Sequence, residues 1–186
     1  MRSIIFLIFH ITTIFVCSSL LAAEEVKFDK ISSNKIYEIR KYSDRLAAEV
    51  VGTREGNSFR KLFRYISGNN EINQKIEMTI PVTRIKKMGN ITMQFYLPSK
   101  FIKNKVPKPS NSELNIITIK GGYYAVIRFS GRDLDKNFIK HEEILKKSLK
   151  KDKILVLGPS IKATFDRPYT LPSLRRNEVM FKIDWK

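Results

Sequence analysis

The chain has 186 residues, a length that suits one domain with a hydrophobic core and is short for two. Apolar residues make up 42% and charged residues 28%, as is typical of a globular protein. Lys and Arg total 35 against 18 Asp and Glu, so the formal net charge is +17. One Cys and two His exclude a disulfide framework, a Cys-rich zinc site, a CxxCH haem attachment, a dithiol redox centre and a His-rich metal site.

Residues 1–23 have the pattern of a secretory signal peptide. Arg2 supplies the positive charge, an apolar stretch covers residues 4–16, and small residues close the segment. Leu20 or Leu21 occupies the position where a small residue is preferred for cleavage. An uncleaved membrane anchor is therefore the alternative interpretation, since the apolar stretch approaches the length that spans a bilayer.

Cleavage of this leader predicts an exported protein, periplasmic or secreted, and changes which side chains are available for chemistry. The mature chain, residues 24–186, is expected to form a single domain. It would keep His141 as its one His and no Cys, because His10 and Cys17 lie in the leader. This eliminates a cysteine nucleophile, and no nucleophile–base motif is present, so we expect no catalytic residues and no enzymatic activity.

The first half of the mature sequence predicts two strands, a helix and two further strands. The strands, which show alternating apolar residues or flanking turn residues, cover 36–42, 46–52, 75–84 and 91–97. Apolar residues at helical spacing indicate the helix, namely Phe59, Leu62, Phe63 and Ile66. Asn57 or Ser58 would cap its start and Gly68 would end it. In the third strand, Met78 and Ile80 are expected to face the core.

The same order of elements returns after a connector rich in Pro and Ser. Strands are predicted at 114–120, 123–129, 160–166 and 178–184, with a helix over 134–151. Each element follows its counterpart by roughly 80 residues, which indicates an internal duplication. We therefore predict an α+β fold in which a duplicated β-β-α-β-β unit forms a mostly antiparallel, curved or closed eight-stranded sheet with two helices. Its pseudo-twofold symmetry would leave a groove between the halves.

Three segments resemble sequences characteristic of the SOUL haem-binding protein family. They are YEIR at 37–40, KIEMTIPVT at 75–83 and RRNEV at 175–179. The resemblance runs from about residue 26 to residue 184, nearly the whole mature chain. It implies a duplicated α+β barrel with a shallow hydrophobic groove that takes haem or a related tetrapyrrole, and it places the first helix beside that groove.

A tetrapyrrole is a flat apolar plate with two carboxylates at one edge, so its site needs apolar walls and cations at the rim. The candidate cofactor-binding residues on the first helix are Phe59, Phe63, Arg60 and Arg64. Leu62 and Ile66 on the same helix are expected in the core. Arg175 and Arg176 are candidates for pairing with the porphyrin carboxylates, although Arg176 could equally pair with Glu178 as a structural clamp.

An axial iron ligand is not evident. Some family members have a His directly after the first of the three segments, whereas this sequence has Lys41, a poor ligand while protonated. His141 lies on or beside the apolar stripe of the second predicted helix, where a hydrogen-bonded, partly buried His is more common than a ligand. We therefore predict no metal ligand and expect binding through apolar contacts and carboxylate pairing, with weak selectivity between haem and iron-free porphyrins.

The positive charge and the duplicated architecture leave two further interpretations open. Lysines are spread along the chain without a nucleic-acid-binding motif, so we expect no nucleic-acid partner, and peripheral contact with an anionic membrane is the favoured alternative. The architecture also resembles bacterial effector-binding domains, which bind other amphipathic molecules and commonly use a buried carboxylate. Glu77 or Glu178 facing the cleft would favour that alternative function.

Overall fold

The computed structural model describes residues 23–186, so the predicted leader lies, apart from Ala23, outside the described residues. The helices are α1 (Glu55–Ile66) and α2 (Asp135–Lys151). The strands are β1 (Glu24–Glu25), β2 (Asp29–Ser33), β3 (Glu38–Tyr42), β4 (Arg45–Gly52), β5 (Thr79–Ile80), β6 (Val82–Lys87), β7 (Asn90–Tyr96), β8 (Leu114–Ile119), β9 (Gly122–Phe129), β10 (Ile161–Thr164) and β11 (Asn177–Ile183). Among these residues, no helix has both the length and the apolar character that crossing a bilayer requires.

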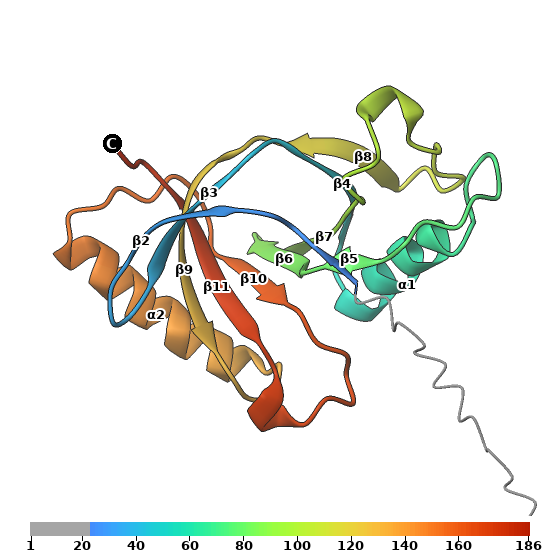
Figure 1. Ribbon diagram of the computed structural model, residues 1–186. Helices are drawn as coiled ribbons and strands as arrows, with labels where there is room; N and C mark the ends of the chain where they lie inside the picture. Colours follow the sequence, from blue (N-terminus) through green and yellow to red (C-terminus); the bar gives the residue numbers. More distant parts are fainter. Residues whose placement is uncertain (1–22) are drawn as a thin grey trace, which may run out of the picture.

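Nine strands form one curled antiparallel sheet in the order β2-β3-β9-β11-β10-β6-β7-β4-β8, and β1 and β5 form a short parallel pair (Figure 1). The predicted α+β class and the duplication are confirmed. A pseudo-twofold axis passes between β10 and β6, and the first strand of each repeat crosses to the other repeat: β3 pairs with β9, and β8 pairs with β4. Neither repeat can therefore complete its sheet alone.

The predicted number of eight strands is wrong, because β2 extends the sheet at the β3 edge. All five residues of β2 are exposed and its sequence is DKISS, so it buries no face and carries no alternating apolar pattern. Alternation of apolar and polar residues arises where a strand buries one face. A strand that is hydrogen-bonded to the edge of a sheet but buries no face does not show this pattern.

The two helices pack on one face of the sheet, α1 against β4 and β7 and α2 against β9 and β11. In Figure 1, α2 lies at the left and α1 at the right of the curled sheet, at the two ends of this face. Leu62 and Ile66 of α1 are buried in the first core, as predicted, and Leu145 and Leu149 of α2 are buried in the second. On the other face of the sheet, a third cluster contains Tyr42, Tyr124, Val126, Ala163 and Met180 and packs against Val26 and Phe28.

Two local predictions in the first repeat are also wrong. Helix α1 begins at Glu55 without a side-chain cap, so neither Asn57 nor Ser58 caps it; an acidic residue in the first turn interacts favourably with the helix dipole. Residues 75–84 do not form one strand, because Pro81 cannot donate a ladder hydrogen bond and separates β5 from β6. Met78, just before β5, is 36% exposed, although it was expected in the core.

The turns that follow the exchanged strands β3 and β8 cross closely at Gly121. A Cβ atom at this position would lie 2.4 Å from the Tyr42 carbonyl oxygen. The Gly121 amide donates a hydrogen bond of 2.9 Å to the Asp44 carboxylate, and Lys120 donates another of 2.8 Å. The amide and then the ammonium group lower the pKa of Asp44. Only a residue without a side chain allows the two turns to approach this closely.

We expect Gly121→Ala to reduce the free energy of unfolding by about 1–3 kcal/mol, because the new methyl group would collide with backbone atoms of the other turn. Gly56→Ala is the matched control: nothing lies within 4 Å of its added Cβ, and Ala favours helix, so stability should be unchanged or higher by up to about 1 kcal/mol. Urea unfolding followed by circular dichroism measures both. Equal midpoints for the two variants would contradict the close crossing.

Candidate functional site

Helix α1 presents an aromatic pair at the protein surface. Phe59 is 39% exposed and Phe63 is 49% exposed, and their rings stack with centroids 6.1 Å apart and planes inclined by 11°. Phe59 is also anchored from below, because its ring meets that of buried Phe95 edge-on at 5.3 Å. The pair is thus an exposed apolar surface fixed to the core on one side.

An arginine follows each phenylalanine of the aromatic pair in the sequence of α1. Arg60 and Arg64 are exposed, and within the described part of the chain neither forms an ion pair. Residues four apart on a helix lie one above the other, so the two phenylalanines and the two arginines form adjacent parallel rows. Lys61, by contrast, pairs with Glu113 at 2.6 Å. The aromatic surface is therefore bordered by two positive charges that no neighbouring carboxylate neutralises.

The loop at 165–176, between β10 and β11, is a second exposed apolar segment. Tyr169, Leu171 and Leu174 are 75%, 65% and 71% exposed. Arg175 stabilises the conformation of the loop, because its guanidinium donates hydrogen bonds to the backbone carbonyls of Thr170, at 2.7 Å, and of Pro168. In Figure 1 the loop runs from β10 to β11 below α1. Strand and helix periodicity did not reveal its three apolar side chains, although large apolar residues beside prolines in a loop are an observable signal.

Arg176 lies in a buried ion network and is not at an open rim. Its Nε donates to Glu178 at 2.8 Å, its Nη1 lies 2.9 Å from Glu25, and its guanidinium covers the ring of Phe165 at 3.7 Å. Glu178 is fully buried and also receives two hydrogen bonds from Arg40, at 2.7 and 2.9 Å. This geometry corresponds to the structural-clamp interpretation of Arg176.

Two charges on Arg side chains compensate the buried Glu178 carboxylate. Burial alone would lower the pKa of Arg40, but the hydrogen bonds and the negative charge of Glu178 outweigh it and raise that pKa above its ordinary value. Glu77, the other carboxylate considered for the cleft, is exposed and pairs with Lys100 at 3.0 Å. Neither acid therefore presents a free negative charge to a ligand.

A second ion network sits where the two repeats meet. Arg84 of β6 and Lys162 of β10 are neighbours across the pseudo-twofold axis, and both are largely buried. Arg84 donates to Glu55, in the first turn of α1, at 2.6 Å and to Asp133 at 2.5 Å. Lys162 pairs with Asp133 and lies 3.8 Å from Asp135, in the first turn of α2. Asp133 thus links cations from both repeats.

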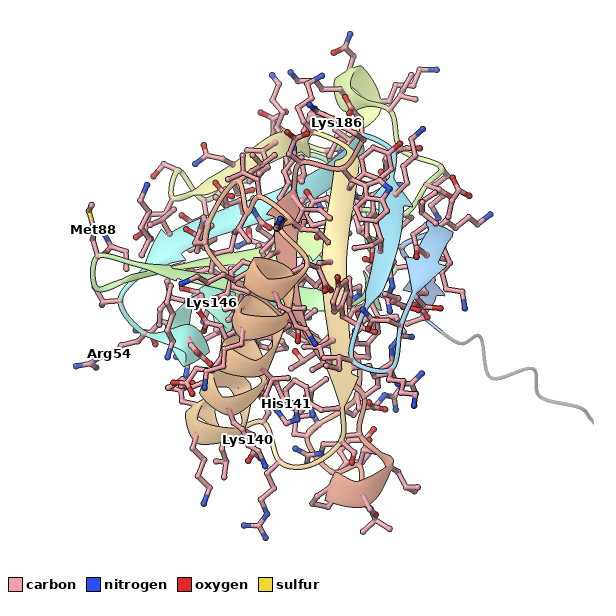
Figure 2. The ribbon with its side chains drawn as sticks, turned by 90° about the vertical axis from the view of Figure 1, so that its left-hand side faces the viewer. Arg54, Met88, Lys140, His141, Lys146 and Lys186 are labelled. Atoms are coloured by element: carbon pink, nitrogen blue, oxygen red, sulfur yellow. The ribbon has the colours of Figure 1, made fainter. Side chains whose placement is uncertain are left out.

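His141 is partly buried on α2, and Figure 2 shows it on the helix next to Lys140. Its Nδ1 lies 2.7 Å from the Asn137 carbonyl oxygen, which requires a proton on Nδ1. Its ring stacks on Phe129 with centroids 3.9 Å apart and planes inclined by 8°. Packing and hydrogen bonding therefore hold this imidazole against the second core, away from the aromatic pair of α1.

Two cavities occur in other parts of the described structure. The first, of about 440 Å³, lies along the N-terminal segment and is lined by Glu25, Val26, Lys27, Phe28, Asp29, Lys41 and Ser43. The second, of about 300 Å³, lies between the repeats and is described below. Phe59 and Phe63 line neither of these two cavities.

Sequence comparison assigns the family directly. The model of the family described as SOUL heme-binding protein matches residues 23–182, which is most of the chain. The chain belongs to the SOUL heme-binding protein family. A search of curated protein sequences finds no significant match. The resemblance carried by the three sequence segments is thereby confirmed for this SOUL-family protein.

Solved structures similar to this SOUL-family protein share its fold at low sequence identity. The EcmrR C-terminal domain is 10% identical with a TM-score of 0.61, covering 81% of this chain and 98% of that one. An uncharacterized conserved protein from Listeria innocua is 9% identical with a TM-score of 0.60, covering 82% and 94%. A hydrolase from Listeria innocua is 8% identical with a TM-score of 0.58, with the same coverages. At these identities the similarity concerns the fold alone.

The network at the junction predicts a pH-dependent effect of Asp133→Asn. Burial alone would raise the pKa of Asp133, but Arg84 and Lys162 outweigh it and lower that pKa. The ionised carboxylate therefore stabilises the fold above its unfolded-state pKa of about 3.9, and this contribution is lost as the pH falls further.

Asp133→Asn should lower the free energy of unfolding by about 2 kcal/mol at pH 7. This difference in stability from the wild type should shrink below about pH 4. Asp29→Asn, on the exposed edge strand β2, is the control and should change stability little at either pH. Urea unfolding at a series of pH values from 7 to 2 provides the measurement. A destabilisation that stays constant over this range would mean that the charge of Asp133 is not what matters.

Proposed function

We propose that this protein binds haem or a related tetrapyrrole on the exposed face of α1. The observation that carries the proposal is the stacked pair Phe59 and Phe63, which remains open to solvent beside Arg60 and Arg64. Membership of the SOUL heme-binding protein family supports a tetrapyrrole ligand. The chain thus combines the two features that such a ligand requires, an apolar face and adjacent positive charge.

The shape of the aromatic pair fits a flat ligand. Two stacked rings can pack their exposed edges, or the outer face of one ring, against a macrocycle, and the buried Phe95 anchors Phe59. Aromatic stacking adds to the energy of burying the apolar surface. The guanidinium groups of Arg60 and Arg64 are suited to the two carboxylates, because they form paired, charge-assisted hydrogen bonds.

The loop at 165–176 is proposed as the second wall of the groove. Its exposed side chains Tyr169, Leu171 and Leu174 offer apolar contact, and Arg175 stiffens the loop through its bonds to backbone carbonyls. Arg176 is proposed to act indirectly, since its guanidinium holds the base of the loop to Glu25 and Glu178. Arg60 and Arg64 therefore replace Arg176 as the favoured partners for the ligand carboxylates.

Iron coordination is not required for this mode of binding. His141 packs on Phe129 and donates to the Asn137 carbonyl, so its ring is committed to the second core. We propose that affinity comes from apolar contact and carboxylate pairing, so haem and iron-free protoporphyrin should bind comparably. Replacing His141 by Ala should leave the absorbance of the bound haem unchanged, and a lost Soret shift would assign the iron ligand to His141 instead.

An amphipathic organic cation is the less suitable ligand for this fold. That alternative requires a free carboxylate facing the cleft, whereas Glu178 is neutralised by Arg40 and Arg176, and Glu77 is exposed and paired. A cation placed beside Glu178 would have to displace two guanidinium groups and leave their charges unpaired, at a cost of several kcal/mol.

We also propose that the protein is exported and touches anionic membranes. The leader at residues 1–23 supports export, and the net charge of +17 supports attraction to anionic lipid. Mass spectrometry of the protein made in a secreting host tests removal of the leader. Flotation of residues 24–186 with neutral vesicles, and with vesicles that also contain phosphatidylserine, tests membrane contact. If the protein floats with neither kind of vesicle, membrane contact is rejected.

Phe63→Asp should weaken haemin binding at least tenfold, a loss of about 1.4 kcal/mol, because a carboxylate would replace the apolar contact. The side chain is half exposed, so the fold should persist. Met88→Asp is the matched control: Met88 is 91% exposed in the turn between β6 and β7 and belongs neither to α1 nor to the loop at 165–176. Absorbance titration with haemin measures both affinities. Equal affinities in the two variants would contradict the proposed site.

Arg60→Gln combined with Arg64→Gln should weaken protoporphyrin binding by about five- to tenfold at low salt, and the effect should diminish as salt screens the charges. The dimethyl ester of protoporphyrin lacks the carboxylates and should bind both proteins equally. Lys140→Gln combined with Lys147→Gln removes the same charge from exposed positions on α2 and is the control. If the α2 variant loses as much affinity, the effect is one of net charge and the assignment of the two arginines fails.

A further inference from the structure

The cavity of about 300 Å³ lies between the two repeats, on the face of the sheet opposite the helices. Both repeats contribute to it, and a connecting segment covers one side. Its lining consists of Ile85, Gln94, Tyr96, Ile119, Lys120, Tyr124, Leu157, Gly158, Pro159, Ile161 and Lys182. The volume is at the lower limit of ligand pockets, which range over about 300–1,000 Å³, so one or two fused rings suit it and a tetrapyrrole does not.

An internal cation, Arg45, lies beside two of the tyrosines that line this cleft, although it is not itself a lining residue. The guanidinium of Arg45 lies 4.2 Å from the ring centre of Tyr42, 5.1 Å from that of Tyr96 and 5.4 Å from that of Tyr124. All three tyrosines are largely buried, and the rings of Tyr42 and Tyr124 meet edge-on at 5.3 Å. Aromatic faces attract cations, so Arg45 satisfies the cage that would otherwise receive a positively charged ligand.

A second cation lines the cavity without a carboxylate partner in the described part of the chain. Lys182 makes one hydrogen bond, to the backbone carbonyl of Lys120 at 3.4 Å. Lys120, by contrast, pairs with Asp44 at 2.8 Å. The buried Gln94 is held by Thr83 at 3.1 Å and by Glu49 at 2.7 Å. Within this cavity, Lys182 is therefore the charged group available to a ligand.

We propose that this cavity is a separate binding site for a small aromatic carboxylate of one or two rings. The isoleucines, Leu157 and Pro159 supply apolar walls, and the edges of Tyr96 and Tyr124 supply aromatic contact. The ammonium group of Lys182 pairs with the carboxylate, and Arg45 repels ligands of positive charge. The site shares no residue with the aromatic face of α1, so it stands independently of tetrapyrrole binding.

The experiment compares 2-naphthoate with 2-naphthylmethylamine, a cation of similar size, by isothermal titration of the protein from residue 24 onward. The wild type should bind the anion and not the cation. Lys182→Gln should weaken 2-naphthoate binding at least fivefold, whereas Lys30→Gln, on the exposed strand β2, should not change it. Phe63→Asp should also leave it unchanged. Failure to bind 2-naphthoate, equal binding of the cation, or equal losses in the two lysine variants would overturn the proposal.

A second variant tests the role of the internal cation. Arg45→Met replaces the guanidinium by an unbranched apolar side chain and so removes the positive charge from the three tyrosine faces. The variant should therefore gain binding of 2-naphthylmethylamine. Circular dichroism and the unfolding midpoint establish that the variant is folded. If the folded variant still rejects 2-naphthylmethylamine, Arg45 does not determine the charge preference of the cavity, and that part of the proposal is wrong.

Discussion

The exchange of first strands between the two repeats is the constraint on which the rest of the structure depends. Because β3 completes the second half and β8 completes the first, each helix must pack on a sheet that contains strands from both repeats. The turns that carry the exchange cross at Gly121, and the ion network around Asp133 ties the two helix starts to the central strands. The cavity between the repeats follows from the same arrangement.

The duplication fixes the scaffold, and the differences between the copies create the surfaces proposed for binding. Helix α1 exposes Phe59 and Phe63, whereas the exposed face of α2 carries lysines such as Lys147 and Lys150. The connection between β6 and β7 is a short turn, but its counterpart between β10 and β11 is the long apolar loop at 165–176. The open aromatic face and the apolar loop each occur in one repeat only. The proposed tetrapyrrole site is therefore expected once, and not twice, in a pseudo-symmetric domain.

The sequence predicted those features that depend on local periodicity. Helical spacing placed Phe59, Leu62, Phe63 and Ile66 on one face of a helix, and Leu62 and Ile66 are buried as expected, whereas Phe59 and Phe63 are exposed. Periodicity could not reveal β2, which buries nothing, or the exposure of Met78, which lies just before the short strand β5. The cage around Arg45 and the network around Asp133 were also missed. Both join residues far apart in the chain, and only the tertiary structure brings such residues together.

The central claim concerns where a tetrapyrrole binds, and NMR tests it most directly. Iron-free protoporphyrin shifts the amide signals of nearby residues through its ring current, and titration into isotope-labelled protein maps them. The account predicts shifts concentrated in residues 59–64 of α1 and in the loop at 165–176. Shifts centred on His141 and Phe129, or on the cavity between the repeats, would contradict it.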